Sequence, residues 1–327
     1  MGYIDMHCDT LMQFCVNSPK NNLYKNDLQV DFLKLKSSNS LAQFFAIFMV
    51  SDDFYKHRNL PAISEKEYFD RLYKGFISEI KKYENIIKFS KSSSDYNDNK
   101  NNEIISAFLT IEDGKIVDND LKNLQQLYDL GVRLISLTWN YENCFGFPNS
   151  TKHLIMNKGL KTFGIEAVER MNELGIIVDV SHLSDGGFWD VVKYSKKPFV
   201  ASHSNCREIT YHPRNLTDEM IRALAEKGGV AGINFGPDFL NNSNYNLKNK
   251  VSKIEDIIKH IRHFINVGGI ECVGIGSDFD GVDGELEVSD ASKMPALINK
   301  MELCGFLPSE IDRIMYKNVE RIINQTL

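Results

Sequence analysis

Eight short apolar runs, separated by segments of helical periodicity, constrain the fold of this chain more than any other feature. The runs are rich in β-branched and aromatic residues, and their apolar character is nearly continuous rather than alternating. Strands of this kind are buried on both faces, as in a parallel sheet. The predicted strands are Tyr3–Met6, Phe44–Val50, Ile104–Ile111, Val132–Thr138, Ile176–Val180, Phe199–Ala201, Val230–Phe235 and Cys272–Ile275.

Helix signals mark the segments between these runs. Ser64-x-x-Glu67 resembles a capping box, and the apolar-periodic stretch after it reaches Tyr83. Glycine recurs just after the last periodic residue, which is a common way for a helix to end. The helices predicted in this way are Leu121–Leu130, Gly164–Leu174, Thr217–Lys227, an isoleucine-striped helix from Ile254 to Ile265, and a last helix from Ser309 towards Ile323. Two polar stretches, Ser90–Glu103 and Leu240–Lys250, are predicted to be surface loops.

Strand and helix alternating eight times predict a closed (β/α)₈ TIM barrel of the metallo-dependent hydrolase type, formed by residues 1–327 as one domain. An open, doubly wound sheet is the structural alternative. Such a sheet normally has a glycine-rich nucleotide turn after its first strand, and Cys8-Asp9-Thr10 does not resemble one. The barrel is therefore the preferred fold.

Composition excludes several classes of function. The net charge of -6 argues against a nucleic-acid surface, which needs a basic stripe. The N-terminal stretch MGYIDMHCDT has no basic segment followed by an apolar one, and no run of ~18 apolar residues occurs, so neither a signal peptide nor a membrane span is expected. We therefore expect a cytoplasmic protein, whose six cysteines are reduced thiols.

Polar residues capable of binding metal follow several predicted strands directly. The first strand ends in His7-x-Asp9, and the others contribute Glu112, His182, His203 and Asp278. In (β/α)₈ enzymes the active site lies at the carboxyl ends of the strands. These side chains are therefore expected to meet at one end of the barrel.

The residue types suit a pair of divalent metals. Imidazole nitrogen and carboxylate oxygen suit Zn²⁺ and also accept Mn²⁺ or Co²⁺. A single catalytic zinc usually keeps three protein ligands and a water, so His7, Asp9, Glu112, His182 and His203 are too many for one ion. Five ligands serve two ions if one carboxylate bridges them.

Each position also has a plain structural interpretation. A lone histidine at a strand end is often only a hydrogen-bonded core residue, Asp9 could cap the following helix, and Glu112 could form a loop ion pair. Convergence at one barrel end favours the metal site. His260 and His263 lie off the isoleucine stripe of their helix and are expected to be solvated.

At these residues the chain resembles the membrane dipeptidase (renal dipeptidase) family, peptidase family M19, in its bacterial cytosolic form. The matching stretches run through nearly the whole chain: Asp5–Thr10, Thr110–Gly114, Gly175–His182, Ala201–Asn205, His212–Asp218 and Gly276–Gly281. The SHSN and RNLTD blocks are together highly specific. The resemblance implies a zinc-dependent dipeptidase that acts through a metal-bridging hydroxide, and a homodimer.

The resemblance also implies separate roles. His7 and Asp9 would hold one zinc ion, His182 and His203 the other, and Glu112 both. Arg214 would bind the free carboxylate of a dipeptide, because a guanidinium group can hold a carboxylate with two hydrogen bonds. Asp278 would carry the proton of the attacking water.

One departure from the family pattern concerns substrate binding. Many members have a histidine after the Leu-Thr that closes the fourth strand, whereas here Trp139 follows Leu137-Thr138. An indole donates one hydrogen bond but carries no charge. Trp139 and Asn140 are therefore the candidate substrate-binding residues on this loop, and Asn143 is an alternative donor.

The leading hypothesis is a dipeptidase, with a D-residue in the second position of the substrate left open. A second hypothesis keeps the dinuclear site but gives it another small amide or lactam as substrate. A third is a metal-binding protein without catalytic activity.

Overall fold

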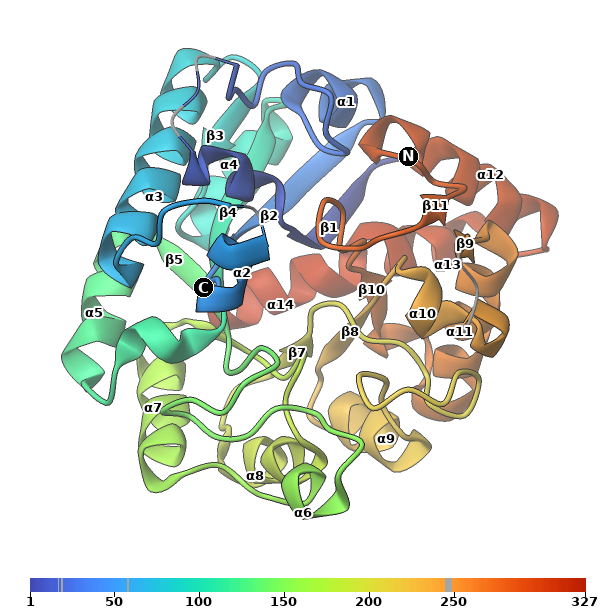
Figure 1. The fold of residues 1–327 in the computed structure, drawn as a ribbon. Helices are drawn as coiled ribbons and strands as arrows, with labels where there is room; N and C mark the ends of the chain where they lie inside the picture. The colour runs from blue at the N-terminus through green and yellow to red at the C-terminus, as the bar shows by residue number, and fades with distance from the viewer. Residues whose placement is uncertain (17, 19, 58, 245–248) are drawn as a thin grey trace.

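Eight parallel strands close into a barrel, which the computed structural model describes for residues 1–327 apart from 17, 19, 58 and 245–248. Each predicted run overlaps one barrel strand, and β2 pairs with β4 to close the ring (Figure 1). The predicted (β/α)₈ barrel is therefore confirmed. In order around the ring the strands are β1 (Tyr3–Cys8), β2 (Ser40–Phe48), β4 (Ile105–Glu112), β5 (Val132–Ser136), β6 (Ile177–Asp179), β7 (Val200–Ala201), β8 (Val230–Ile233) and β10 (Val273–Ile275).

Helices surround this ring (Figure 1). The α-helices are α1 (Phe32–Ser37), α2 (Asp52–His57), α3 (Glu65–Lys82), α4 (Ser93–Asn101), α5 (Leu121–Leu130), α6 (His153–Met156), α7 (Thr162–Leu174), α8 (Asp185–Tyr194), α9 (Asp218–Glu226), α10 (Pro237–Leu240), α11 (Ile254–Gly268), α12 (Met294–Leu303), α13 (Pro308–Asp312) and α14 (Asn318–Thr326). A π-helical turn, Arg313–Lys317, joins α13 to α14. Three short strands lie outside the ring: β3 (Ile87–Phe89), β9 (Val251–Ser252) and β11 (Glu285–Leu286).

Several predicted helix ends are confirmed by a capping serine or by a glycine after the last turn. Ser64 Oγ accepts the backbone N–H of Glu67 at 3.2 Å and so begins α3. Gly131 and Gly175 end α5 and α7 in the left-handed region, with φ of +100° and +80°. These glycines adopt that conformation without the penalty that a Cβ would bring.

The stretch Ser90–Glu103, predicted to be a loop, contains helix α4, so that prediction was wrong. Ser92 caps the helix by accepting the N–H of Asp95 at 3.1 Å. Tyr96 is fully buried against the barrel, and Asn99 is hydrogen-bonded to buried serines on either side. A helix fixed by one apolar residue and side-chain hydrogen bonds shows no apolar stripe in the sequence. Of the other predicted loop, Leu240–Lys250, residues 245–248 lie outside the described part of the chain.

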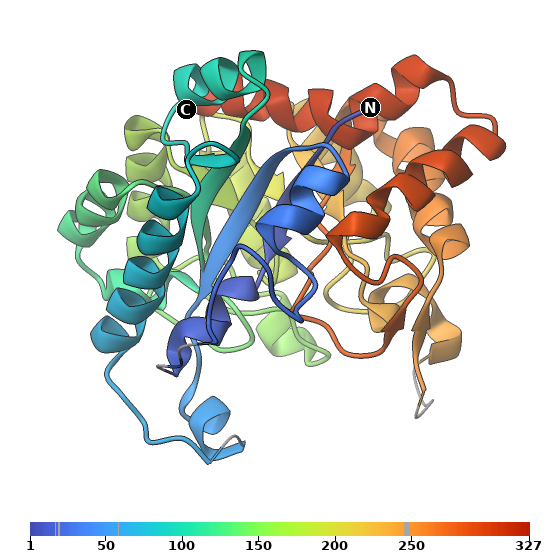
Figure 2. The same ribbon diagram turned by 90° about the horizontal axis from the view of Figure 1, so that it is seen from above.

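Two apolar clusters pack against the strands. One lies between the strands and the outer helices. The other fills the barrel with Ile4, Phe44, Phe108, Leu134, Ile177, Val200 and Val230, and α14 adds Val319, Ile322 and Ile323 to it. Figure 2 shows α14 crossing one end of the barrel, close to both chain termini. The strands begin at this end, so their carboxyl ends open on the opposite side, where the site residues lie.

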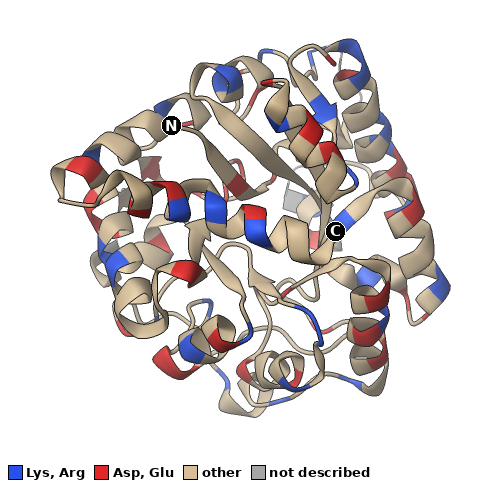
Figure 3. Ribbon diagram, turned by 180° about the vertical axis from the view of Figure 1, so that it is seen from behind, with Lys and Arg blue, Asp and Glu red and all other residues tan. Residues whose placement is uncertain are grey.

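Charged residues lie mainly on the outer helices (Figure 3). In this view Lys and Arg alternate with Asp and Glu around the barrel. Within the described residues, no helix is both long enough and apolar enough to cross a bilayer. All six cysteines are free, as predicted.

His260, predicted to be solvated, is fully buried in α11. Its Nε2 donates to the Leu240 carbonyl at 3.0 Å, and its Nδ1 accepts the N–H of Cys206 at 3.0 Å. Burial lowers the pKa of His260 to about 4, so the ring is neutral. The buried face of α11 is wider than its isoleucine stripe. His263, on the outer edge of the helix, forms an ion pair with Asp218 at 2.6 Å and remains partly exposed.

Candidate metal centre

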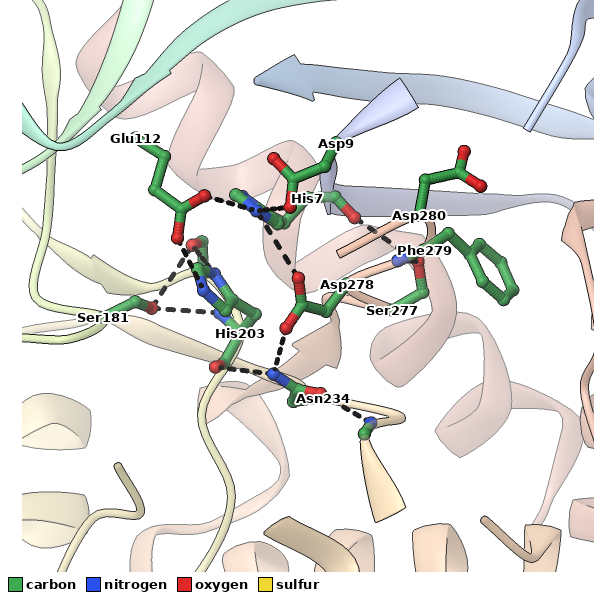
Figure 4. Close-up of polar contacts among 12 residues, drawn as sticks. His7, Asp9, Glu112, Ser181, His203, Asn234, Ser277, Asp278, Phe279 and Asp280 are labelled. Carbon is green, nitrogen blue, oxygen red and sulfur yellow. Dashed lines mark hydrogen bonds and ion pairs between the residues drawn. The ribbon is translucent and has the colours of Figure 1, made fainter. Parts of the chain in front are cut away.

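The five predicted ligands meet at the carboxyl end of the barrel. His7 lies in β1 and Asp9 just after it, Glu112 ends β4, and His182 and His203 follow β6 and β7. All five are buried. Their ligand atoms form clusters within 4.8 Å, namely His7 with Asp9 and Glu112, Glu112 with His182 and His203, and His7 with His203 and Asp278. The structure thus brings the five side chains together, and Figure 4 shows four of them, His7, Asp9, Glu112 and His203.

His7 faces three carboxylates without a hydrogen bond to any of them. Its Nε2 lies 3.5 Å from Glu112 Oε2, 3.6 Å from Asp9 Oδ2 and 3.7 Å from Asp278 Oδ1. Both ring nitrogens of His7 and Asp9 Oδ1 are buried without a hydrogen-bond partner among the described residues. Buried polar atoms are almost always satisfied. A divalent cation between these atoms would satisfy Nε2 and the carboxylates together, so the donor set fits a metal.

The second cluster brings the Nε2 atoms of two tilted imidazole rings together. His182 Nε2 lies 2.8 Å from Glu112 Oε1 and 3.0 Å from His203 Nε2. The Nδ1 atoms contact oxygens instead, Asn140 Oδ1 at 3.1 Å and Ser202 Oγ at 2.7 Å. If each Nδ1 carries the proton, two Nε2 lone pairs point at each other and repel unless a cation lies between them. Glu112 offers Oε1 to this cluster and Oε2 to His7, which is the arrangement of a bridging carboxylate.

Burial sets the protonation of the second cluster. It lowers the pKa of His182 and of His203 well below the usual histidine range, and the nearby cationic groups Arg214 and His7 lower it further. Both rings are therefore neutral, which is the form that binds metal.

The first cluster is rich in negative charge. Burial, and then the charge of Asp9, raises the pKa of Glu112 to about 8. Burial alone would lower the pKa of His7, but the carboxylates of Glu112 and Asp9 outweigh it and hold that pKa well above the usual range. Without a metal, protons therefore neutralise this cluster. A divalent cation would take their place.

Asp278 lies beside His7 and is held by a residue that the sequence analysis missed. Asn234, just after β8, donates from Nδ2 to Asp278 Oδ2 at 2.7 Å (Figure 4). Its own Oδ1 accepts the N–H of Gly236 at 2.6 Å. Asn234 lies one residue before the end of the predicted strand Val230–Phe235. Its signal in the sequence is this position, because the other site residues are also polar residues at the carboxyl ends of predicted strands.

Local backbone geometry holds two site residues in unusual positions. His182 and Asp278 have φ of +68° and +61°, a backbone region that residues other than glycine rarely occupy. Such residues cluster at functional sites. Gly281 permits the close approach of the carboxylates, because a Cβ there would lie 2.2 Å from Asp9 Oδ2 and 2.5 Å from Asp278 Oδ1.

A cavity of about 280 Å³ opens onto the metal centre. Trp139 lines it and packs against Phe48, with ring centroids 4.8 Å apart. Asn140 lines it too, although its side-chain oxygen is engaged by His182. Asp238 and Lys250, which form a 2.6 Å ion pair, complete the wall together with Met12, Phe239, Val282 and Asp283.

Arg214 is buried beside the second cluster. Its guanidinium group donates to the carbonyl of His203 at 3.1 Å and to Ser204 Oγ at 3.2 Å. Its Nε has no partner, and none of the ion pairs among the described residues includes it. The ring of Phe239, 5.6 Å from its guanidinium carbon, lies in the cavity wall. Arg214 is thus a buried cation one side chain away from the cavity.

Comparison with known proteins identifies the family. The family model described as membrane dipeptidase, peptidase family M19, matches residues 1–327. The chain belongs to this family. A Schizosaccharomyces pombe protein described as an uncharacterised dipeptidase is 37% identical over 249 residues, which is 75% of this chain and 59% of that protein. An uncharacterised Klebsiella pneumoniae protein from the pqqA 5′ region is 32% identical over 243 residues, 72% of this chain and 88% of that one.

A solved structure shares the fold of the whole chain. The crystal structure of a metallopeptidase from Rhodobacter sphaeroides, liganded with a phosphinate mimic of the dipeptide L-Ala-D-Ala, superposes with a TM-score of 0.90. It is 24% identical and covers 100% of this chain and 99% of that one. This likeness confirms the fold, while the family model confirms the predicted family, and a metallopeptidase family implies a divalent metal.

Proposed function

We propose that this M19 protein is a dinuclear metallo-dipeptidase that hydrolyses dipeptides with a free C-terminal carboxylate. The observation that carries the proposal is the position of Glu112, whose two carboxylate oxygens face two separate groups of buried donors. His7 and Asp9 would hold one ion, and His182 and His203 the other. Imidazole and carboxylate ligands suit zinc. When bound, the two cations supply a water of lowered pKa and polarise the peptide carbonyl.

Asp278 would move the proton. Its Oδ2 is occupied by Asn234, so Oδ1, which faces His7, is the oxygen free to take a proton from the attacking water. The same oxygen would then give that proton to the leaving amine. Burial raises the pKa of Asp278, which brings this carboxyl closer to the range useful for proton exchange.

Arg214 would bind the substrate carboxylate. A buried guanidinium group without an acidic partner among the described side chains is a strong anion site, because the ion pair it makes is poorly screened. Arg214 does not itself line the cavity, whereas Phe239, whose ring lies 5.6 Å from the guanidinium carbon, does, so the proposal requires this part of the wall to open on binding. Trp139, which lines the same cavity, would offer its indole N–H to the substrate.

A D-residue in the second position is part of the proposal. The Rhodobacter sphaeroides structure contains a mimic of L-Ala-D-Ala, and its fold covers this whole chain. The dipeptide panel that tests the activity also tests this stereochemical preference.

Metal analysis combined with a dipeptide panel tests the proposal. The purified protein is expected to contain about two zinc ions per chain and to lose activity with a chelator. The panel includes L,L and L,D dipeptides and the C-terminal amide of the best substrate. Equal hydrolysis of the amide would refute the role of Arg214 and favour another small amide or lactam. Full activity with fewer than about two ions per chain would refute the dinuclear site. The homodimer and the cytoplasmic location stay predictions.

A further inference from the structure

Beneath the metal centre lies a buried carboxylate that the proposed reaction does not use. Asp179 ends β6 and is fully buried. Its Oδ1 accepts the backbone N–H groups of Ser181 at 2.9 Å and Ser202 at 2.8 Å. Its Oδ2 accepts the hydroxyls of Ser136 and Ser202, the latter at 2.6 Å. Four donors therefore surround Asp179, and none of them is charged.

The hydrogen-bond chain continues from Asp179 to a proposed metal ligand. Ser202 Oγ lies 2.7 Å from His203 Nδ1. A serine hydroxyl has one proton, and Ser202 donates it to Asp179. His203 Nδ1 must then be the donor in its contact with Ser202, which leaves the lone pair of the neutral ring on Nε2. That atom faces Glu112 and His182.

We propose that Asp179 is a positioning residue that acts through Ser202 to fix the tautomer of His203. Partners of this kind orient metal-binding histidines and keep the correct nitrogen free. The functional value of this fixed tautomer rests on the proposed metal site. The tautomer itself is a property of the metal-free protein and can be measured without any activity.

A second aspartate–serine pair in the same barrel distinguishes this role from a purely structural one, in which the carboxylate only joins two strands. Asp5 in β1 accepts both the N–H of Ser277, at 2.8 Å, and its hydroxyl, at 2.6 Å. Ser277 Oγ accepts the N–H of Phe279 at 3.1 Å and lies 3.3 Å from the backbone carbonyl of His7, but among the described residues it contacts no imidazole ring (Figure 4). Asp5 and Asp179 therefore join neighbouring strand ends in the same way, but only Asp179 connects to a histidine ring.

The replacement Asp179→Asn should reverse the direction of the hydrogen bonds that run from residue 179 through Ser202 to His203. The two backbone N–H groups on Oδ1 are fixed donors, so the amide oxygen of asparagine must stay on that side. The amide NH₂ then faces Ser202 Oγ and donates to it. The freed serine proton turns to its nearest acceptor, His203 Nδ1, and forces the ring proton onto Nε2. This variant therefore presents an N–H where the metal needs a lone pair.

Nitrogen NMR of ¹⁵N-histidine-labelled, metal-free protein tests the inference, with His203→Gln used to assign the His203 signals. We expect the Nδ1–H tautomer in the parent, the Nε2–H tautomer in Asp179→Asn, and the Nδ1–H tautomer in the matched control Asp5→Asn. The inference would be overturned by an Nε2–H tautomer of His203 in the parent, by an unchanged tautomer in Asp179→Asn, or by the same change of tautomer in Asp5→Asn.

Serine variants provide a second test if Asp179→Asn fails to fold. Ser202→Ala should lose the preference for Nδ1–H, whereas Ser202→Thr, which retains a hydroxyl, should keep it. Zinc competition with a chelator should show about 10–100-fold weaker binding in Ser202→Ala than in Ser202→Thr. Identical tautomers and affinities in the two variants would refute the relay. The expected tautomers in a parent protein without dipeptidase activity would refute only the proposed function.

Discussion

Asn234 provides the sharpest test of how Asp278 is held. Its Nδ2 donates to Asp278 Oδ2 at 2.7 Å, and its Oδ1 accepts the N–H of Gly236 at 2.6 Å. Asn234→Ala removes both contacts. Asn234→Asp keeps the shape and the bond from Gly236, but it places an oxygen where the donor to Asp278 was.

The expected size of the effect follows from the charge on Asp278. A hydrogen bond to a charged group contributes about 1.5–3 kcal/mol. At about 1.4 kcal/mol for each factor of ten, Asn234→Ala should lower kcat/KM about 10–150-fold. Asn234→Asp should lower it further, because two buried carboxyls then compete for one proton. The Asn234 hydrogen bond lowers the pKa of Asp278, so both variants should move the acidic limb of the pH profile to higher pH.

Steady-state kinetics from pH 5 to 9 on zinc-loaded protein would check this. Zinc content and thermal unfolding of each variant serve as controls, so that lost metal or lost structure is not mistaken for lost catalysis. A kcat/KM within twofold of the parent in both variants, with zinc retained, would show that Asn234 does not hold the reacting carboxylate.

Four further outcomes follow from the same site. Asp278→Asn should abolish hydrolysis while zinc content stays at the parent level; residual activity above about 1% would exclude Asp278 as the proton carrier. Arg214→Met should lower kcat/KM for a dipeptide at least about tenfold and leave its C-terminal amide unaffected, because only the free carboxylate needs the cation. Gly281→Ala should weaken zinc binding in a competition assay, since its Cβ would lie 2.2 Å from Asp9 Oδ2; parent-like affinity would contradict this geometry. The metal-free protein should lose thermal stability as pH rises from about 4.5 to about 8, because the pKa of Glu112 is raised from 4.5 to about 8 in the fold and the carboxyl must ionise while buried; zinc should abolish that trend.

The barrel could be predicted from the sequence because its strands are buried on both faces. Runs such as Ile104–Ile111 have few polar residues, and each overlaps an observed strand. Strand ends then pointed to the site, since parallel strands bring their carboxyl ends together. What stayed hidden depends on tertiary contacts: α4 is held by Tyr96 and side-chain hydrogen bonds, and His260 is buried by the packing of its helix.

The hydrogen bonds that organise the site were the least predictable part. Asp179 and Ser202 lie within motifs that were recognised, but nothing in their spacing says that one hydroxyl connects a carboxylate to an imidazole. Asn140 was expected to contact substrate, and the structure also brings its oxygen to the Nδ1 of His182. Such contacts depend on distances of a few tenths of an ångström, which sequence patterns do not specify.

The loop after β5 contributes to both the cavity wall and the hydrogen bonding of His182. Trp139 forms a wall of the cavity, and its neighbour Asn140 is the hydrogen-bond acceptor for His182. A loop transferred from a relative with another substrate range would change both the cavity and the hydrogen bond to His182, a proposed metal ligand, in one step. Engineering of selectivity at this loop therefore requires variation at position 139 with asparagine kept at position 140.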